Sequence, residues 1–197
     1  VMYFNCDVCV TINGSAGEGS NTSTYFDKIW IQQCTTGFSL SGTGVNYLNT
    51  SSIKDSIVEY CSTAFILDGI IADLTIDNVH LEANTVEFKS TLWGGTILVN
   101  DVKGSGQVNF INVGAGFENR YAYKFTNCKF PTLNVQGGLN NLDIYTDNMD
   151  FIGAMPANCR LYDIAGNLYS LTPTVGLQYK NGQKLIAKPV PTTGAYT

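Results

Sequence analysis

Two glutamates, the single histidine and a tryptophan are the residues of this chain whose types suit chemistry on a sugar. Glu59 and Glu82 are separated by 23 positions, His80 stands two residues before Glu82, and Trp30 and Gln32 lie in an earlier segment of similar pattern. Two carboxylates about 5–5.5 Å apart can cleave a glycosidic bond with retention, because one attacks the sugar while the other donates a proton. An indole ring adds a flat face on which a sugar ring can stack. The elements that carry these side chains must bring them together.

A repeated sequence indicates what those elements are. Nearly the same nine residues occur twice, as CTTGFSLSG from Cys34 and CSTAFILDG from Cys61, 27 positions apart. An earlier copy, CDVCVTING, lies 28 positions before the first of these, and a degenerate copy follows the second by 23 positions. Self-similarity at such a period is the signature of a solenoid in which each copy forms one coil.

Apolar and polar residues alternate inside each copy, as in KIWIQQC and GFSLSG. This period of two predicts two short strands per copy, each with one face inward, and an all-β parallel solenoid. Stacked coils place equivalent residues about 4.8 Å apart, so inward side chains form ladders. The predicted ladders are Tyr3 (or Val1), Ile31, Val58 and Leu81; Val10, Phe38, Phe65 and Phe88; and Ile12, Leu40 and Leu67.

The same register turns the candidate residues outward. Trp30 aligns with His80, and Gln32 aligns with Glu59 and Glu82, so the two carboxylates are expected on adjacent coils with Cβ atoms about 5 Å apart. Glu59 and Glu82 are therefore the candidate catalytic pair, and Trp30, Gln32 and His80 are the candidate substrate-binding residues. The alternative is a solvated surface without function, on which His80 is simply hydrogen-bonded.

A neighbouring outward row contains Lys28, Asp55 and Asn78. Its charges predict a cross-coil salt bridge, which at an exposed position is worth under about 1 kcal/mol. We expect no chemistry from this row.

The six cysteines predict no metal site, and no segment predicts a cofactor. Cys6, Cys34 and Cys61 align at a corner of successive copies, where a small, weakly polar residue fits, and this favours inert core thiols. Cys6 and Cys9 form one CxxC pair without a second pair or an adjacent histidine, so the spacing lacks a zinc signature. The glycine-rich segments SAGEGS, KGSGQ and VGAGF lack the strand, helix and lysine context of a phosphate-binding loop.

Composition argues against nucleic acid and membranes as partners. The formal net charge is −5, and Lys and Arg form no run. A phosphate backbone or an anionic lipid surface would require a basic patch. No apolar stretch approaches the roughly 18 residues of a membrane span.

The pattern changes toward the C-terminus. Strand-like pieces continue after Gly94 with a blurred period, which predicts irregular coils as far as residue 155. Gly166-Asn167 and Asn181-Gly182 suit two-residue hairpin turns, so residues 156–197 predict short hairpin-like segments, a β-rich extension and the start of a linker. Because the chain begins within a coil and neither end carries a solenoid cap, we expect a longer parent protein.

The ladders, the corner pattern C-x-x-G/A-F-x-L-x-G and the segment NVHLEANTVEF resemble right-handed parallel β-helix proteins of the pectate-lyase-like superfamily, in particular bacteriophage tailspikes. The similarity runs from about Val1 to Phe88 and continues weakly to Phe151. The resemblance implies a homotrimeric virion tail protein, joined to other tail proteins through segments outside this chain, that binds and hydrolyses a bacterial surface polysaccharide such as capsule or lipopolysaccharide. Catalytic carboxylates vary in position within the family, so none is transferred to this chain.

Two other functions stay open at this point. The β-helix of a tail protein can be a rigid shaft that presents loops to a receptor without catalysis, and a secreted bacterial polysaccharide lyase or adhesin would share the fold. A lyase would need a carboxylate cluster for Ca²⁺, or a Lys or Arg base near an acid. The sequence shows no set of three acids on one face of successive coils, which favours hydrolysis over elimination.

Overall fold

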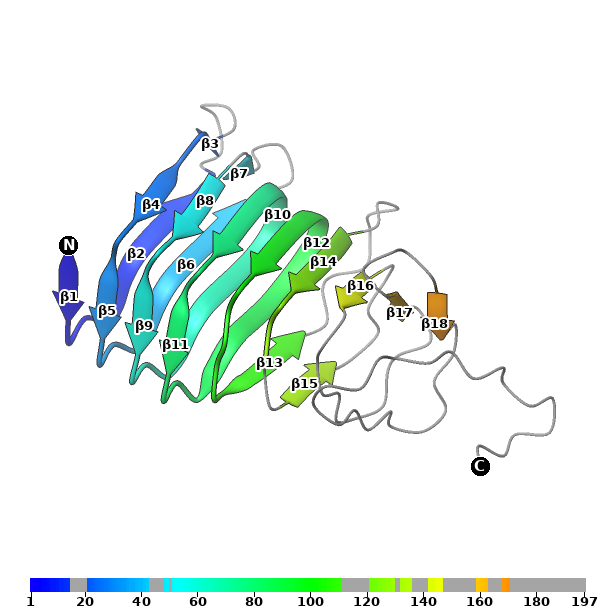
Figure 1. Cartoon of the computed structure of the whole chain (residues 1–197). Coiled ribbons are helices and arrows are strands. Elements are labelled where there is room, and N and C mark those ends of the chain that lie inside the picture. Colours follow the sequence, from blue (N-terminus) through cyan, green and yellow to red (C-terminus); the bar gives the residue numbers. More distant parts are fainter. Residues whose placement is uncertain are drawn as a thin grey trace.

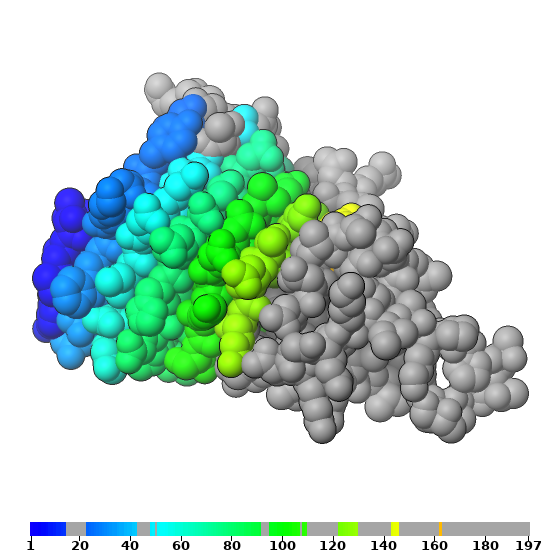
Figure 2. Space-filling model, in the orientation of Figure 1, coloured from blue at the N-terminus to red at the C-terminus, as the bar shows by residue number. Residues whose placement is uncertain are grey.

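The computed structural model describes residues 1–14, 21–42, 48–49, 51–110, 121–129, 132–135, 142–146, 159–162 and 168–170. Every regular element among them is a β-strand, and the strands stack in parallel as a β-solenoid of about four turns (Figure 1). The space-filling view shows the described coils as adjacent bands of colour (Figure 2). The all-β parallel solenoid expected from the repeat is therefore confirmed. The described residues include no helix with the length and apolar character that a membrane crossing requires.

The strands form two sheets. The smaller sheet contains one three-residue strand from each of the first four coils, in the order β1 (Met2–Phe4), β5 (Trp30–Gln32), β9 (Ile57–Glu59) and β11 (His80–Glu82). The main path of the larger sheet runs through β2 (Val8–Asn13), β6 (Thr36–Gly42), β10 (Thr63–Asp77), β12 (Val86–Asn100), β14 (Tyr121–Thr126), β16 (Leu142–Thr146), β17 (Cys159–Tyr162) and β18 (Leu168–Ser170). Its remaining strands are β3 (Asn21–Thr22), β4 (Tyr25–Asp27), β7 (Leu48–Asn49), β8 (Ser51–Lys54), β13 (Gln107–Phe110) and β15 (Thr132–Val135).

All three predicted ladders are present in the predicted register, with Tyr3 rather than Val1 at the start of the first. The phenylalanine ladder is the clearest, because the ring of Phe65 stacks on Phe38 at 5.2 Å and on Phe88 at 5.0 Å between centroids. The three rings are fully buried. The third ladder continues from Leu67 to Ser90, whose buried hydroxyl accepts a hydrogen bond from the Tyr123 hydroxyl. The inward row thus supplies a continuous apolar core.

In the third and fourth coils the second strand is longer than expected. β10 and β12 each run for 15 residues and bend at register shifts that follow Gly69 and Ile71. Gly95 lies at this bend with a φ of 113°, and a Cβ atom there would be 1.6 Å from the carbonyl oxygen of Ile71. Only glycine fits such a position, because it alone lacks the Cβ atom and adopts this φ without strain. One continuous strand therefore passes from one face of the coil to the next.

Strand pairing explains why the period falls from 27 to 23. Gly42 pairs with Gly69, and Leu48 pairs with Ile71. The chain therefore advances six positions between these two pairs in the earlier coil but only two positions in the later coil. The four additional residues fall between β6 and β7. The residues on either side of this corner keep their register, so the ladders are unaffected.

Two corners of each coil are turned by single residues with positive φ, between 48° and 57°. This left-handed conformation is costly for most residues but is tolerated by Asn and Asp, which make up more than half of the two rows. The first row, after the short strands, is Asn5, Gln33, Tyr60 and Ala83; the second, before them, is Lys28, Asp55, Asn78, Asp101 and Asn127.

The strand-like pieces expected after Gly94 are confirmed as the end of β12 and as β13 to β16. β17 still pairs in parallel with β16, although it follows the predicted boundary at residues 155 and 156, and β18 then pairs with β17 in the antiparallel direction. The two arms of the predicted hairpin are thus paired. The Gly166-Asn167 turn, the Asn181-Gly182 turn and residues 171–197 lie outside the described residues, and the domain boundary stays a prediction.

Candidate functional site

The small sheet carries all five residues proposed as a sugar site. Ile31, Val58 and Leu81 are buried at the centres of their strands, so the residues on either side of each point away from the core. One outward row pairs Trp30 with Ile57 and Ile57 with His80; the other pairs Gln32 with Glu59 and Glu59 with Glu82. The structure therefore places the two glutamates on adjacent strands in direct register, with the tryptophan and the histidine on the same face.

Hydrogen bonds join four of these residues into two pairs. The indole Nε1 of Trp30 donates to Oε1 of Glu59 at 2.9 Å, across the coils, while Nε2 of His80 lies 3.1 Å from Oε2 of Glu82 within β11. Trp30 is 40% exposed, and the side chains of His80 and Glu82 are 57% and 53% exposed. Each carboxylate therefore already has a partner and contacts water. The arrangement suits binding of a polar ligand more directly than proton transfer.

A shallow groove of about 520 Å³ adjoins the histidine. It mixes carboxylate, amide, hydroxyl, imidazole and ammonium groups with two aliphatic side chains. Such a lining offers both donors and acceptors to a polyhydroxylated ligand. The lining residues are Asp55, Ser56, Ile57, Asn78, Val79, His80, Asp101 and Lys103.

Two groove residues, Asp101 and Lys103, were missed in the sequence, although a signal exists. They stand 23 positions after Asn78 and His80, which is the period of the preceding coils. A β-bridge pairs His80 with Lys103, so the lysine continues the outward row of the small sheet. The repeat pattern blurs after Gly94, and for that reason the row could not be followed from ladder residues alone.

The sequence predicted a cross-coil salt bridge between Lys28 and Asp55, and this prediction is wrong: the ion pairs of the described residues do not include one between these two. Lys28 instead lies 3.5 Å from Asp27 of its own coil, and the Asn78 amide donates to Asp55 at 2.6 Å. The cross-coil ion pair occurs one position earlier in the coil, between Lys54 and Asp77 at 3.9 Å. The charges that alternate across the coils are those of Asp27, Lys54 and Asp77, because the register pairs these three positions.

A buried carboxyl group, Glu87, lies behind this surface and was not anticipated. It is fully buried, and its two oxygens accept hydrogen bonds from the Asn84 amide at 2.9 Å and from the backbone N–H of Gly106 at 2.8 Å. Burial raises its pKa, and these hydrogen bonds oppose the shift. Glu87 aligns with Ala64 of the previous coil, so the alternating pattern gave no sign of a charge at this position.

The corner cysteines form the expected stack. Cys34 and Cys61 are buried, and burial raises the pKa of Cys61 to about 11, which agrees with an inert thiol. The Cys34 sulfur accepts a hydrogen bond from the backbone N–H of Cys6 in the coil before it. In the same way, the side chain of Asn84 in the fourth coil accepts one from the N–H of Cys61 in the third. Asn84 therefore replaces a cysteine in the same role.

Comparison with known proteins does not extend these observations. No family model, no curated protein and no solved structure matches the chain. The fold therefore rests on the strand pairing described above, and the likeness to tailspikes rests on sequence motifs alone. The chain is therefore assigned to a fold class, the all-β parallel β-solenoids.

Proposed function

We propose that this chain is a tailspike-type β-solenoid segment whose small sheet and adjoining groove bind a bacterial surface polysaccharide. The observation that carries the proposal is the register that sets Trp30, Glu59, His80 and Glu82 side by side on one exposed face. Such a face combines an aromatic platform with charged hydrogen-bonding groups on rigid elements. This combination is what recognition of a sugar chain requires.

The hydrogen bonds on this face support preorganised binding. The bond from Trp30 to Glu59 holds the indole ring against the sheet, so a sugar that stacks on it would immobilise little additional side-chain freedom. The groove beyond His80 prolongs the polar surface across the coils, from Asp55 to Lys103. A surface elongated across several coils suits a polymer better than a single small molecule.

Glycoside hydrolysis by Glu59 and Glu82 is the second candidate, and the direct pairing of the two residues favours it. Adjacent strands lie about 4.8 Å apart, close to the carboxylate separation of retaining enzymes. In this mechanism one carboxylate would attack the sugar and the other would protonate the leaving oxygen. The bonds to Trp30 and His80 would have to rearrange when substrate enters, because both carboxylates are engaged in them.

The oligomeric state and the location on a virion are part of the same proposal. The resemblance to tailspikes implies a homotrimer on a virion tail, in contact with other tail proteins. For a parent protein that contains this chain, a trimer predicts three times the mass of the parent polypeptide in light scattering after size-exclusion chromatography. A monomeric parent would contradict this part of the proposal without touching the sugar site.

Binding is tested with the full chain on a panel of capsular and lipopolysaccharide glycans. Trp30→Ala and His80→Ala are expected to weaken the affinity for a bound glycan by roughly tenfold or more, since about 1.4 kcal/mol corresponds to a factor of ten. Lys89→Ala is the matched control, because Lys89 is also exposed but lies on β12 of the other sheet. If no glycan binds, the solenoid is a shaft rather than a receptor for sugars. If all three variants bind a glycan alike, the sugar is held elsewhere and the small sheet is not the binding site.

Hydrolysis is tested separately with Glu59→Gln and Glu82→Gln. New reducing ends released from the bound glycan, and lost in both variants while binding persists, would support the catalytic pair. Unsaturated sugar products would point to a lyase instead. Binding without any cleavage would leave the chain a binding module.

A further inference from the structure

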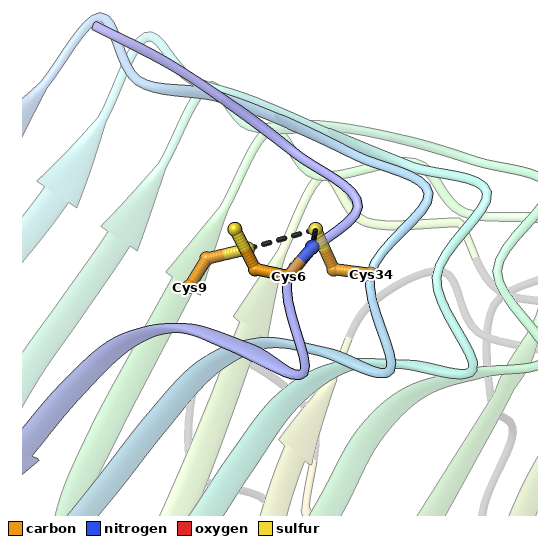
Figure 3. A group of neighbouring side chains, drawn as sticks. All are labelled: Cys6, Cys9 and Cys34. Carbon is orange, nitrogen blue, oxygen red and sulfur yellow. Dashed lines mark hydrogen bonds between the residues drawn. The ribbon is translucent and has the colours of Figure 1, made fainter.

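Three cysteine thiols gather at one corner of the first two coils, next to the ends of β1 and β5. The sulfur atoms of Cys6, Cys9 and Cys34 all lie within 4.8 Å of one another (Figure 3). Cys6 and Cys9 belong to the first coil and are half-buried, whereas Cys34 belongs to the second and is buried. The CxxC pair, which lacks a second pair in the sequence, thus gains a third sulfur through coil stacking.

The cluster is more than the repeated corner stack. Cys6, Cys34 and Cys61 follow from the repeat, but Cys9 does not, because its equivalents in the next two coils are Gly37 and Ala64. The side chain of Cys9 reaches the stack and its sulfur lies 2.8 Å from that of Cys34. A third thiol is therefore placed where the other coils carry no functional group.

The geometry points to a site for a thiophilic divalent cation of the Zn²⁺ type, and we propose that Cys6, Cys9 and Cys34 bind it through three sulfur atoms. Sulfur atoms around a tetrahedral zinc ion, each about 2.3 Å from the metal, are roughly 3.8 Å apart. The separations in the cluster, from 2.8 Å to at most 4.8 Å, lie on both sides of this value. Small side-chain rotations would bring the sulfurs to the required spacing, and the fourth position would be filled by water or another donor.

The surroundings are suited to such a site. The backbone N–H of Cys6 donates to the Cys34 sulfur at 3.3 Å, and such a bond stabilises a thiolate. A cysteine binds a metal ion as the thiolate, so the ion must displace the proton of each thiol. Metal binding therefore releases protons and becomes stronger as the pH rises. The ion would join the first coil to the second across 25 to 28 positions of sequence.

The test uses the full chain, reduced and freed of metal, titrated with Co²⁺ under anaerobic conditions. We expect one Co²⁺ per chain, a thiolate-to-metal charge-transfer band that saturates, and displacement of Co²⁺ by Zn²⁺. Zn²⁺ should also raise the melting temperature, because it binds only the folded cluster. Cys9→Ser should abolish the band and the thermal shift, while Cys61→Ser, at the next corner of the same stack, should retain both.

Circular dichroism of the Cys9→Ser variant shows whether it is folded. If it is not, the same titration is made with Cys9→Ala. The proposal is overturned if the reduced chain takes up no Co²⁺, or if uptake persists unchanged without the Cys9 sulfur. It is equally overturned if the reduced chain binds nothing and the air-oxidised chain shows a Cys9–Cys34 disulfide in peptide mapping. The cluster would then be a redox pair and not a metal site.

Discussion

At the scale of single residues, Glu87 shows how a charge is accommodated in an apolar corner. Its carboxylate receives hydrogen bonds from the Asn84 amide and from the Gly106 backbone, so it anchors the loop of the next coil. A Cβ atom on Gly104 would collide with this side chain, which lies 2.7 Å away at its nearest oxygen. Gly104 of the segment KGSGQ is thus explained by contact with a buried carboxylate, whereas a Cβ atom on Gly106 would meet the carbonyl oxygen of Asn84 at 2.4 Å.

Replacement of Glu87 by glutamine should change how stability depends on pH. The folded-state pKa of Glu87 is raised, so the stability it contributes is fully present below its ordinary pKa of about 4.5 and is lost as the pH rises through the raised value. Glutamine does not titrate. The free energy of unfolding of Glu87→Gln, relative to the parent, should therefore increase as the pH rises above the ordinary pKa of the carboxyl group.

Urea denaturation at a series of pH values measures this difference. A constant offset is expected in addition, because the amide NH₂ of glutamine would face either the Asn84 amide or the Gly106 N–H, both of which are donors. The slope with pH carries the prediction. Two parallel stability curves would show that the carboxyl group titrates alike in the folded and unfolded chain.

The candidate site shows what the sequence can and cannot predict about residues. The positions of Trp30, Glu59, His80 and Glu82 followed from the repeat, because coil stacking converts a fixed spacing into a lateral contact. Their partners did not follow, since the bonds from Trp30 to Glu59 and from His80 to Glu82 depend on side-chain rotamers. The proximity of Cys9 to Cys34 escaped for the same reason.

At the scale of elements, the left-handed corner residues set how sharply each coil turns. Asn and Asp occupy five of the nine positions in the two rows, and their side chains bond across coils, as Asn127 does to Asp101 and Asn78 does to Asp55. The other four positions have different residues, and the one after β11 is Ala83, with a φ of 54°. Alanine has no polar side chain with which to offset the cost of that conformation.

Ala83→Asn is expected to stabilise the protein by about 0.5–1 kcal/mol, because Asn tolerates the left-handed region better than alanine does. Ala83 is exposed, so the larger side chain has room. Thr85→Asn is the matched control, since Thr85 is exposed in the same corner without a positive φ, and it should change stability by less than about 0.5 kcal/mol. Equal effects of the two substitutions in urea denaturation would contradict the explanation by backbone strain.

The sequence predicted the short strands better than the long ones. Strands β1, β5, β9 and β11 have a clear alternation and end at turn residues, whereas β10 continues through Gly69, and glycine inside a strand weakens it. In the structure the bend at Gly69 is absorbed by a register shift, so pairing with β12 resumes beyond it. Such a continuation depends on contacts between coils, which local propensity does not contain.

At the scale of the whole molecule, one apolar cluster extends from Val10 to Ile144 and links all the described coils. Residues that pair between neighbouring coils are 20 or more positions apart in the sequence. A single coil therefore has few local contacts of its own and is not expected to fold independently. We therefore expect the described coils to unfold together, because each coil contributes to the same ladders. Loss of a central ladder residue should weaken the whole solenoid.

Phe65→Ala should lower the free energy of unfolding by about 3–5 kcal/mol, because Phe65 is stacked between Phe38 and Phe88 and is fully buried. Tryptophan fluorescence and far-ultraviolet circular dichroism should report the same shifted midpoint. Lys89→Ala, on the exposed side of the adjacent strand, should leave the midpoint nearly unchanged. Separate midpoints for the two probes would indicate that the coils unfold independently.

The corner between Gly42 and Leu48 holds four residues more than its counterpart between Gly69 and Ile71, yet the partners on either side remain paired. Length at this corner is thus independent of the core. A foreign peptide, such as an affinity tag or an epitope, could be inserted between Gly42 and Leu48 and displayed on a rigid support. Evolution could use the same freedom to diversify the outside of the molecule while the interior stays constant.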